Sequence, residues 1–422
     1  MRRRTALLVA LAAGAFWAAP AHASNWCGTP GTVDRLPQGN PGAPVHEVYA
    51  VPSDGTDRLE SEIGTEMQTD AETIDLWWRG QDPTRTPRFD TLGFGCGPQL
   101  DISIVRLPST STELAPVETS FLKIVDGLGK AGFTSDFTKY LVYYDGPTSD
   151  ADVCGEGGGS PDGEGVAIVF VDSCSGEPSS VTAAHELLHA MGALPPGAPH
   201  ACLGDPGHPC DSRLDILYPS ADGTPLSGLT LDVGHDDYYG HSGSWFDVRD
   251  SRWLRHLDQP EIHLSVTIIG SGNVASDVPG ISCTVSCESD WDANQTVDLT
   301  PTPANGMRFV RWTGACGGRS DCLLGFDQPE NVTALFAPVT FPLTISVAGR
   351  GGVFTSDSMG PCRVHCRFAV FSYLTTTLRA VPAAGWKFKR WAGACRGTRP
   401  TCSLPMTSAM AAGAVFRMKS AR

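Results

Sequence analysis

The stretch that decides the fold reads Glu177-Pro178-Ser179-Ser180-Val181-Thr182-Ala183-Ala184-His185-Glu186-Leu187-Leu188-His189-Ala190-Met191-Gly192, directly after the apolar run Val166–Val171. Ser179 is suited to cap a helix and Gly192 to end it in a left-handed conformation. On that helix His185 and His189 lie one turn apart on one face, with Glu186 beside them. This spacing predicts a site for one Zn²⁺ ion, with Glu186 polarising its water. The alternative is a buried helix whose histidines share this spacing by chance.

The segment resembles the active-site helix of the metzincin zinc peptidases, whose pattern is His-Glu-x-x-His-x-x-Gly-x-x-His. His185, Glu186, His189 and Gly192 match that pattern, but Pro195 stands where the third histidine is expected. The resemblance implies a zincin-like α/β domain, with a mixed sheet plus helices, that hydrolyses peptide bonds. Since catalytic zinc normally has three protein ligands, the third ligand must come from elsewhere.

Two later histidines and two carboxylates are candidates for the third ligand. In some metzincins, such as the leishmanolysin type, an insertion separates the glycine from the last histidine. A Pro-rich turn precedes His200, which we favour, and His208 is the second choice. A carboxylate, Asp205 or Asp211, is the third. Cys202 and Cys210 bracket this loop and would hold it if bonded together.

The string Asp215-Ile216-Leu217-Tyr218-Pro219 resembles the Met-turn of metzincins, with Leu217 in place of the methionine. Leu and Met have similar volumes, so the apolar floor under the metal would be kept. The resemblance makes Tyr218 a candidate catalytic residue, acting on the zinc or the transition-state oxyanion. Its alternative is a tyrosine at the edge of the core with its hydroxyl in water.

A dense acidic stretch, Asp232–His241, suggests a Ca²⁺ site built of oxygen ligands. The spacing of an EF-hand is absent, so a solvated acidic turn is the alternative.

The rest of the segment 24–260 alternates strand and helix patterns, which predicts an α/β fold. The expected strands are 46–51, 100–107, 139–144 and 166–171. Apolar residues three or four apart predict a helix over 59–78, and a second helix is expected over 117–131, ended by Gly132.

The last third of the chain repeats itself at an offset of 79 residues, with the string Arg-Trp-x-Gly-Ala-Cys in both copies. Alternating runs such as Leu343–Val347 predict two small all-β modules, 261–339 and 340–422. Each module holds four cysteines, for which disulfides are favoured over zinc because CxxC pairs are lacking. The modules resemble bacterial repeats related to the internalin B-type repeats, a resemblance that implies an architecture and no ligand.

The first 23 residues have the pattern of a secretory signal: Arg2–Arg4, an apolar run 6–19 and Ala21-His22-Ala23. All 14 cysteines follow it, which predicts a secreted, extracellular protein with a disulfide framework, free or bound to a cell surface. No later stretch is apolar enough to span a membrane. Cys27 is expected to pair with Cys96, the alternative being a latency thiolate over the zinc.

The formal net charge of −15 argues against a nucleic-acid partner. The second module differs, because it holds twelve Lys and Arg against the single acid Asp357, a charge of +11. This contrast favours either docking onto an anionic cell-surface polymer or packing against the acidic domain 24–260.

Taken together, these patterns predict a secreted zinc metalloendopeptidase that acts on a protein or peptide, with Glu186 as general base and His185, His189 and His200 as metal ligands. One alternative is an adhesion protein whose repeats carry the function beside a degenerate zinc domain. Another is a zinc hydrolase of non-peptide amides or esters.

Overall fold

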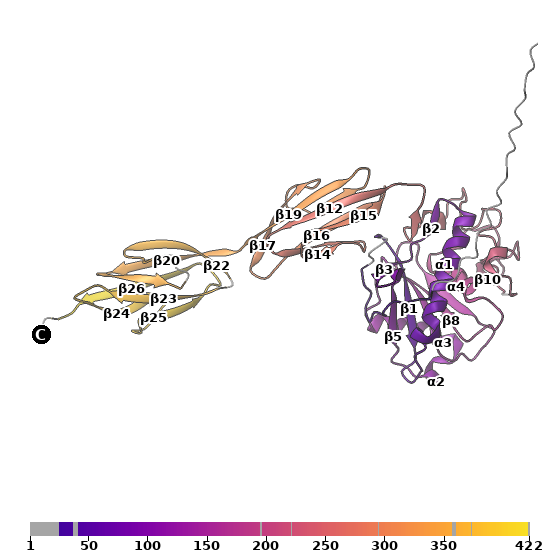
Figure 1. Cartoon of the computed structure of the whole chain (residues 1–422), viewed down its shortest axis with the longest axis horizontal. Coiled ribbons are helices and arrows are strands. Elements are labelled where there is room, and N and C mark those ends of the chain that lie inside the picture. The colour runs from indigo at the N-terminus through magenta and orange to yellow at the C-terminus, as the bar shows by residue number, and fades with distance from the viewer. Residues whose placement is uncertain are drawn as a thin grey trace, which may run out of the picture.

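The computed structural model of the chain consists of three bodies in a row, an N-terminal unit with helices and strands and two all-β modules (Figure 1). It describes residues 25–36, 41–194, 196–220, 222–293, 295–356, 360–372 and 374–420. The predicted signal, 1–23, and Pro195 lie outside the described residues. No helix in the described ranges is both long enough and apolar enough to cross a membrane.

A five-stranded sheet in the order β5-β1-β6-β8-β7 forms the centre of the N-terminal unit. Its strands are β1 (Val45–Val51), β5 (Ile102–Arg106), β6 (Lys139–Tyr144), β7 (Gly155–Gly159) and β8 (Gly165–Phe170). Four of them are parallel, and β7 runs antiparallel to β8 at the edge. Strands β1 and β6 are buried along their whole length, as expected of inner strands covered on both faces. The four predicted strands are confirmed.

Helices cover both faces of this sheet. The helices are α1 (Gly64–Gln81), which continues the short π-helix η1 (Leu59–Ile63), α2 (Ser111–Leu114), α3 (Val117–Lys130) and α4 (Ser179–Ala190). Val45 and Tyr49 of β1 share a core cluster with α1 and α4, whereas Val48 and Ala50 point to the cluster that contains α3. The N-terminal unit is therefore an α/β layer structure, although strands dominate the chain as a whole.

One local prediction, the cap of α4, is wrong. Pro178 occupies the N-cap without a side-chain hydrogen bond, and Ser179 is the first helical residue. The Ser179 side chain instead hydrogen-bonds the carboxylates of Glu66 and Asp70 on α1, so a tertiary contact replaces the local cap. Gly192 ends the helix with φ +89°, as predicted.

Shorter elements complete the N-terminal unit. They are β2 (Arg85–Pro87) paired with β11 (Leu254–His256), β3 (Thr91–Phe94) with β4 (Gly97–Leu100), β9 (Ala201–Cys202) with β10 (Asp205–Pro209), and the 3-10 helices η2 (Leu226–Gly228) and η3 (Val248–Asp250). Three disulfides bind this unit: Cys27–Cys96, Cys154–Cys174 and Cys202–Cys210. Cys27 is thus paired as expected and does not act as a latency thiolate.

Each module consists of two sheets packed around a core of its own. The first has the sheets β15-β12-β19-β17 and β14-β13-β16-β18, made of β12 (Glu261–Ile269), β13 (Gly272–Ser276), β14 (Ser282–Cys283), β15 (Cys287–Asp292), β16 (Thr296–Pro303), β17 (Met307–Gly314), β18 (Cys322–Gly325) and β19 (Glu330–Pro338). The second has the sheets β22-β20-β26-β24 and β21-β23-β25, made of β20 (Thr340–Ala348), β21 (Gly351–Thr355), β22 (His365–Phe371), β23 (Thr375–Pro382), β24 (Trp386–Gly393), β25 (Thr401–Pro405) and β26 (Met410–Met418). The module cysteines pair locally, two disulfides in each: Cys283–Cys287, Cys316–Cys322, Cys362–Cys366 and Cys395–Cys402.

A buried ion pair joins the N-terminal unit to the first module. Arg88, 2% exposed, pairs with Asp292 at the end of β15, 4% exposed. Arg88 also donates to the Pro41 carbonyl oxygen at 3.0 Å, and Asp292 accepts from the His256 backbone N–H at 3.2 Å. Because both charges are removed from water and hydrogen-bonded, loss of either partner leaves an uncompensated buried charge.

We therefore expect Asp292→Ala to destabilise the protein by about 3–5 kcal/mol, because Arg88 stays buried without its counter-ion. Denaturant unfolding followed by tryptophan fluorescence measures this loss. Asp327→Ala, at an exposed acid of the same module, is the control and should change stability little. Equal stability of the two variants would show that the junction is open to water.

Candidate metal centre

Three histidine side chains meet beside α4. His185 and His189 project from successive turns of the helix, and His208 reaches them from β10. The Nε2 atoms of His185 and His189 are 3.2 Å apart, and His208 Nε2 lies 3.2 Å from the first and 3.3 Å from the second. The three nitrogens form a nearly equilateral triangle.

This triangle fits one zinc ion. Three nitrogens at about 2.0–2.1 Å from a tetrahedral zinc are about 3.3 Å from one another, with a fourth position left open. The two helix imidazoles are also held in the neutral form that binds metals. Burial, followed by the nearby His208, lowers the pKa of His185 to about 4, and burial beside the other two histidines lowers the pKa of His189 well below its usual value.

The turn that resembles the Met-turn orients the first ligand. His185 Nδ1 donates to the Ile216 carbonyl oxygen at 2.7 Å, which leaves Nε2 free to bind metal. The turn is fixed by the buried carboxylate of Asp215, which accepts from the Leu217 and Val233 backbone N–H groups and from the Tyr238 hydroxyl, each at 2.8 Å. Leu217 is fully buried in the core cluster that also contains Leu187 and Leu188 of α4, so the exchange for methionine keeps an apolar side chain at this position.

The position of the third histidine corrects the sequence expectation. His200 lies outside the triangle: its backbone N–H and its ring Nδ1 lie 2.9 and 3.1 Å from the carboxylate of the buried Asp237. The hairpin β9–β10, closed by Cys202–Cys210, presents His208 instead, with Asp205 Oδ2 2.9 Å from His208 Nδ1. His200 is nearer than His208 to Gly192 in the sequence, which favoured it as the third ligand. The fold of the hairpin β9–β10 brings His208 to the helix instead.

Glu186, a residue of α4, packs tightly against the edge strand β7. A Cβ atom on Gly155 would lie 2.7 Å from Glu186 Cγ, and one on Gly157 would lie 2.5 Å from the Glu186 carbonyl oxygen. The glycines of β7 are therefore what allows the helix to approach the strand. Burial, and secondarily the charge of Glu156, raises the pKa of Glu186 to about 8.

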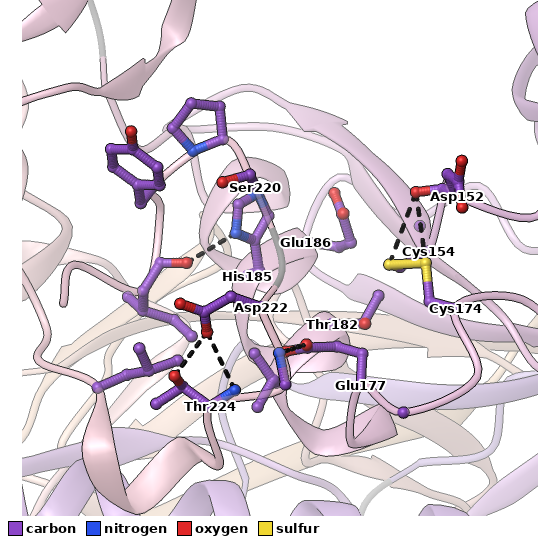
Figure 2. A pocket seen from close by; sticks show the side chains of 18 of the residues that line it. Asp152, Cys154, Cys174, Glu177, Thr182, His185, Glu186, Ser220, Asp222 and Thr224 are labelled. Atoms are coloured by element: carbon purple, nitrogen blue, oxygen red, sulfur yellow. Dashed lines mark hydrogen bonds between the residues drawn. A yellow bond between two sulfur atoms is a disulfide. The ribbon is translucent and has the colours of Figure 1, made fainter. Parts of the chain in front are cut away.

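The site opens into a pocket of about 780 Å³ that His185, Glu186, His208 and Tyr218 help to line. In Figure 2, Asp152 and the Cys154–Cys174 disulfide lie on one side of His185 and Glu186, and Asp222 and Thr224 on the other. The walls of this pocket have no signature in the sequence, since no local motif links residues 152–155 to 219–224.

Tyr218 lines the same pocket as His185 and His208, as its position in the sequence suggested. The guanidinium of Arg213 stands 5.3 Å from the centre of its ring. This cation–π contact holds the ring at the rim of the pocket.

Two of the three carboxylates in the acidic stretch 232–241, those of Asp232 and Asp237, are buried and hydrogen-bonded within the protein, whereas Asp236 is exposed. Asp232 is fully buried and accepts hydrogen bonds from the backbone N–H groups of Asp237, Tyr238 and Tyr239. Asp237 is fully buried as well and binds His200. These two carboxylates shape a loop, so the alternative of a solvated turn does not hold for them, and the Ca²⁺ site stays a prediction.

A zinc-binding experiment can distinguish His208 from His200 as the third metal ligand, because only His208 lies at the triangle. We expect His208→Ala to lose zinc on dialysis against a weak chelator, because two ligands remain, whereas His200→Ala should keep one zinc per chain. Elemental analysis of the dialysed proteins gives the stoichiometry. The reverse pattern would move the third ligand to His200.

Comparison with known family models supports the assignment of the two modules. Residues 274–340 and 372–420 match the divergent InlB B-repeat domain, which confirms the resemblance of the two modules to internalin B-type repeats. No curated protein matches the chain.

Solved structures resemble the chain only remotely. OgpA from Akkermansia muciniphila is 12% identical with a TM-score of 0.27, covering 70% of this chain and 97% of its own. The Bacillus anthracis TIE protein is 8% identical with a TM-score of 0.25, over 38% of this chain and 34% of its own. The minor pilin GBS52 of Streptococcus agalactiae is 5% identical with a TM-score of 0.17, over 38% and 98%. Likenesses of this size carry no argument for function.

Proposed function

We propose that the N-terminal unit is a zinc metallopeptidase that is secreted together with its two repeat modules. One observation carries the proposal: three histidines offer their Nε2 atoms at 3.2–3.3 Å from one another, and a buried glutamate lies next to them on the wall of an open pocket. A glutamate beside a His₃ site is one arrangement that supports metal-assisted hydrolysis. The seven disulfides favour an oxidising, extracellular location.

The substrate would bind along β7. This strand forms the edge of the central sheet and borders the pocket through Gly155, so an extended peptide can add to it as a further strand. Backbone hydrogen bonds of this kind hold a peptide irrespective of its side chains. They favour a peptide over a small ester or amide as the substrate.

Zinc held by His185, His189 and His208 would supply the positive charge that acidifies water and polarises the scissile carbonyl. The charge of zinc next to Glu186 would favour its carboxylate form over the protonated form that burial favours. In that form Glu186 accepts a proton from the attacking water as the water oxygen bonds to the carbonyl carbon. Glu186 then delivers that proton to the amide nitrogen as the C–N bond breaks, so that the products are a carboxylic acid and an amine. Tyr218, at the rim of the same pocket, would donate a hydrogen bond to the oxyanion.

The adhesion alternative rests on the missing ligand at Pro195. His208 offers a third nitrogen, so a complete ligand set supports the enzyme. The non-peptide hydrolase is distinguished by assay, with casein and a peptide library compared against simple esters.

We expect Glu186→Gln to keep one zinc per chain and to lose peptidase activity by about 10²–10⁴-fold, because the general base is gone. Elemental analysis and kcat/KM on a peptide library measure the two effects. Activity equal to that of the parent protein would refute the proposed mechanism.

Tyr218→Phe should lower kcat by about tenfold or more with zinc retained and KM little changed, because the lost hydrogen bond acts only in the transition state. A rise in KM with kcat unchanged would instead assign the tyrosine to substrate binding.

A further inference from the structure

The two modules share one fold but carry opposite charge. Residues 340–422 have a formal charge of +11, whereas residues 261–339 hold nine acids against three bases, a charge of −6. The first 260 residues carry −20. The basic character is therefore confined to the last module of the chain.

In the second module, several basic residues share the outer face of one sheet. Along β24, Phe388 and Trp391 belong to the core, so Lys387 and Arg390 point outward. Arg417 pairs with Lys387 across β26 and β24. On the opposite edge strand, β22, Arg367 alternates with residues that pack on the core.

Small residues form the floor between these two basic edges. Arg367 on β22 is followed across the sheet by Thr344 and then Ala411, and the next row runs His365, Ser346, Gly413 and Ala392. With strands about 4.8 Å apart, β22 and β24 stand about 14 Å from each other. Arg367 lies at one corner of this face, whereas Arg390, Lys387 and Arg417 lie in rows at the opposite corner. The face is therefore a diagonal strip with cations at both ends.

The cations of this strip are not neutralised within the protein. Among the residues that the structure describes, no carboxylate forms an ion pair with any Lys or Arg of the second module. Figure 1 shows this module at the far end of the molecule from α4 and β8, with the first module between them. The alternative, in which the basic face packs on the acidic N-terminal unit, is not the observed arrangement.

We propose that the outer face of the sheet β22-β20-β26-β24 binds a linear cell-wall polymer of phosphodiester-linked units. A phosphodiester carries a full negative charge in each repeat, and guanidinium groups bind phosphate oxygens through paired N–H···O bonds. The floor of hydroxyl, methyl and hydrogen side chains lets an extended chain lie flat between the cations. Phe371, 40% exposed at the end of β22, is a large apolar side chain on this face. Because membrane binding grows with the apolar area that is buried, a single ring gives a lipid bilayer little to hold, which favours a polymer over a membrane surface.

The first module provides an internal comparison. At the position of Arg367 it has Glu288, which faces Ser265 in the same register as Arg367 faces Thr344. Arg308 and Arg311 of the first module stand where the second has Lys387 and Arg390. The cations of the edge strand are therefore common to both modules, whereas Arg367 and Arg417, which replace Glu288 and Ala337, belong to the second module alone.

The test uses the full-length protein and purified poly(glycerol phosphate), with EDTA present so that the result does not depend on the proposed peptidase site. The triple variant Arg367→Gln, Lys387→Gln, Arg390→Gln removes three charges from the strip. The matched control Arg350→Gln, Arg379→Gln, Arg399→Gln removes three exposed charges elsewhere in the module. Binding is measured by calorimetry over a series of salt concentrations.

We expect the strip variant to bind about tenfold more weakly or worse at low salt and to show a shallower salt dependence, while the control stays within about threefold of the parent protein. Equal losses of affinity in the two variants would show that binding depends only on the net charge of the module, and this would overturn the proposal. So would absence of binding at low salt, or tighter binding to phosphatidylglycerol vesicles or to polygalacturonate.

Discussion

The close approach of α4 to the edge of the central sheet is the constraint on which the rest of the candidate site depends. At Gly155, Gly157 and Gly159 a Cβ atom would lie within 2.2–2.5 Å of the helix or of a neighbouring strand, so β7 contacts the helix through backbone alone. This contact buries Glu186 and directs His185 and His189 toward the hairpin that presents His208. A bulkier edge strand would push the helix outward and separate these groups.

The sequence predicts the elements that have a local signature. Buried apolar runs such as Lys139–Tyr144 became strands, and the periodic stretch from Leu59 became a helix. His185, Glu186 and His189 lie within about one helical turn, so their relation follows from the helix itself. The cysteines of the modules pair over four to seven residues, which places those disulfides within single turns.

What the sequence does not predict depends on contacts between distant segments. His208 stands well beyond Gly192 in the chain, and its role follows from the hairpin β9–β10, which has no strong strand pattern. Ser179 binds Glu66 and Asp70 rather than the end of its own helix, since α1 packs against α4. The walls of the pocket likewise come from loops that meet only after folding.

The ion pair between Arg88 and Asp292 distinguishes the two modules from each other. The residue of the second module equivalent to Asp292 is Phe371, which ends β22 as Asp292 ends β15. Only the copy next to the N-terminal unit has a buried guanidinium to neutralise at this position. The order of the copies is therefore fixed by chemistry, because an exchange would set an aromatic ring against a buried guanidinium.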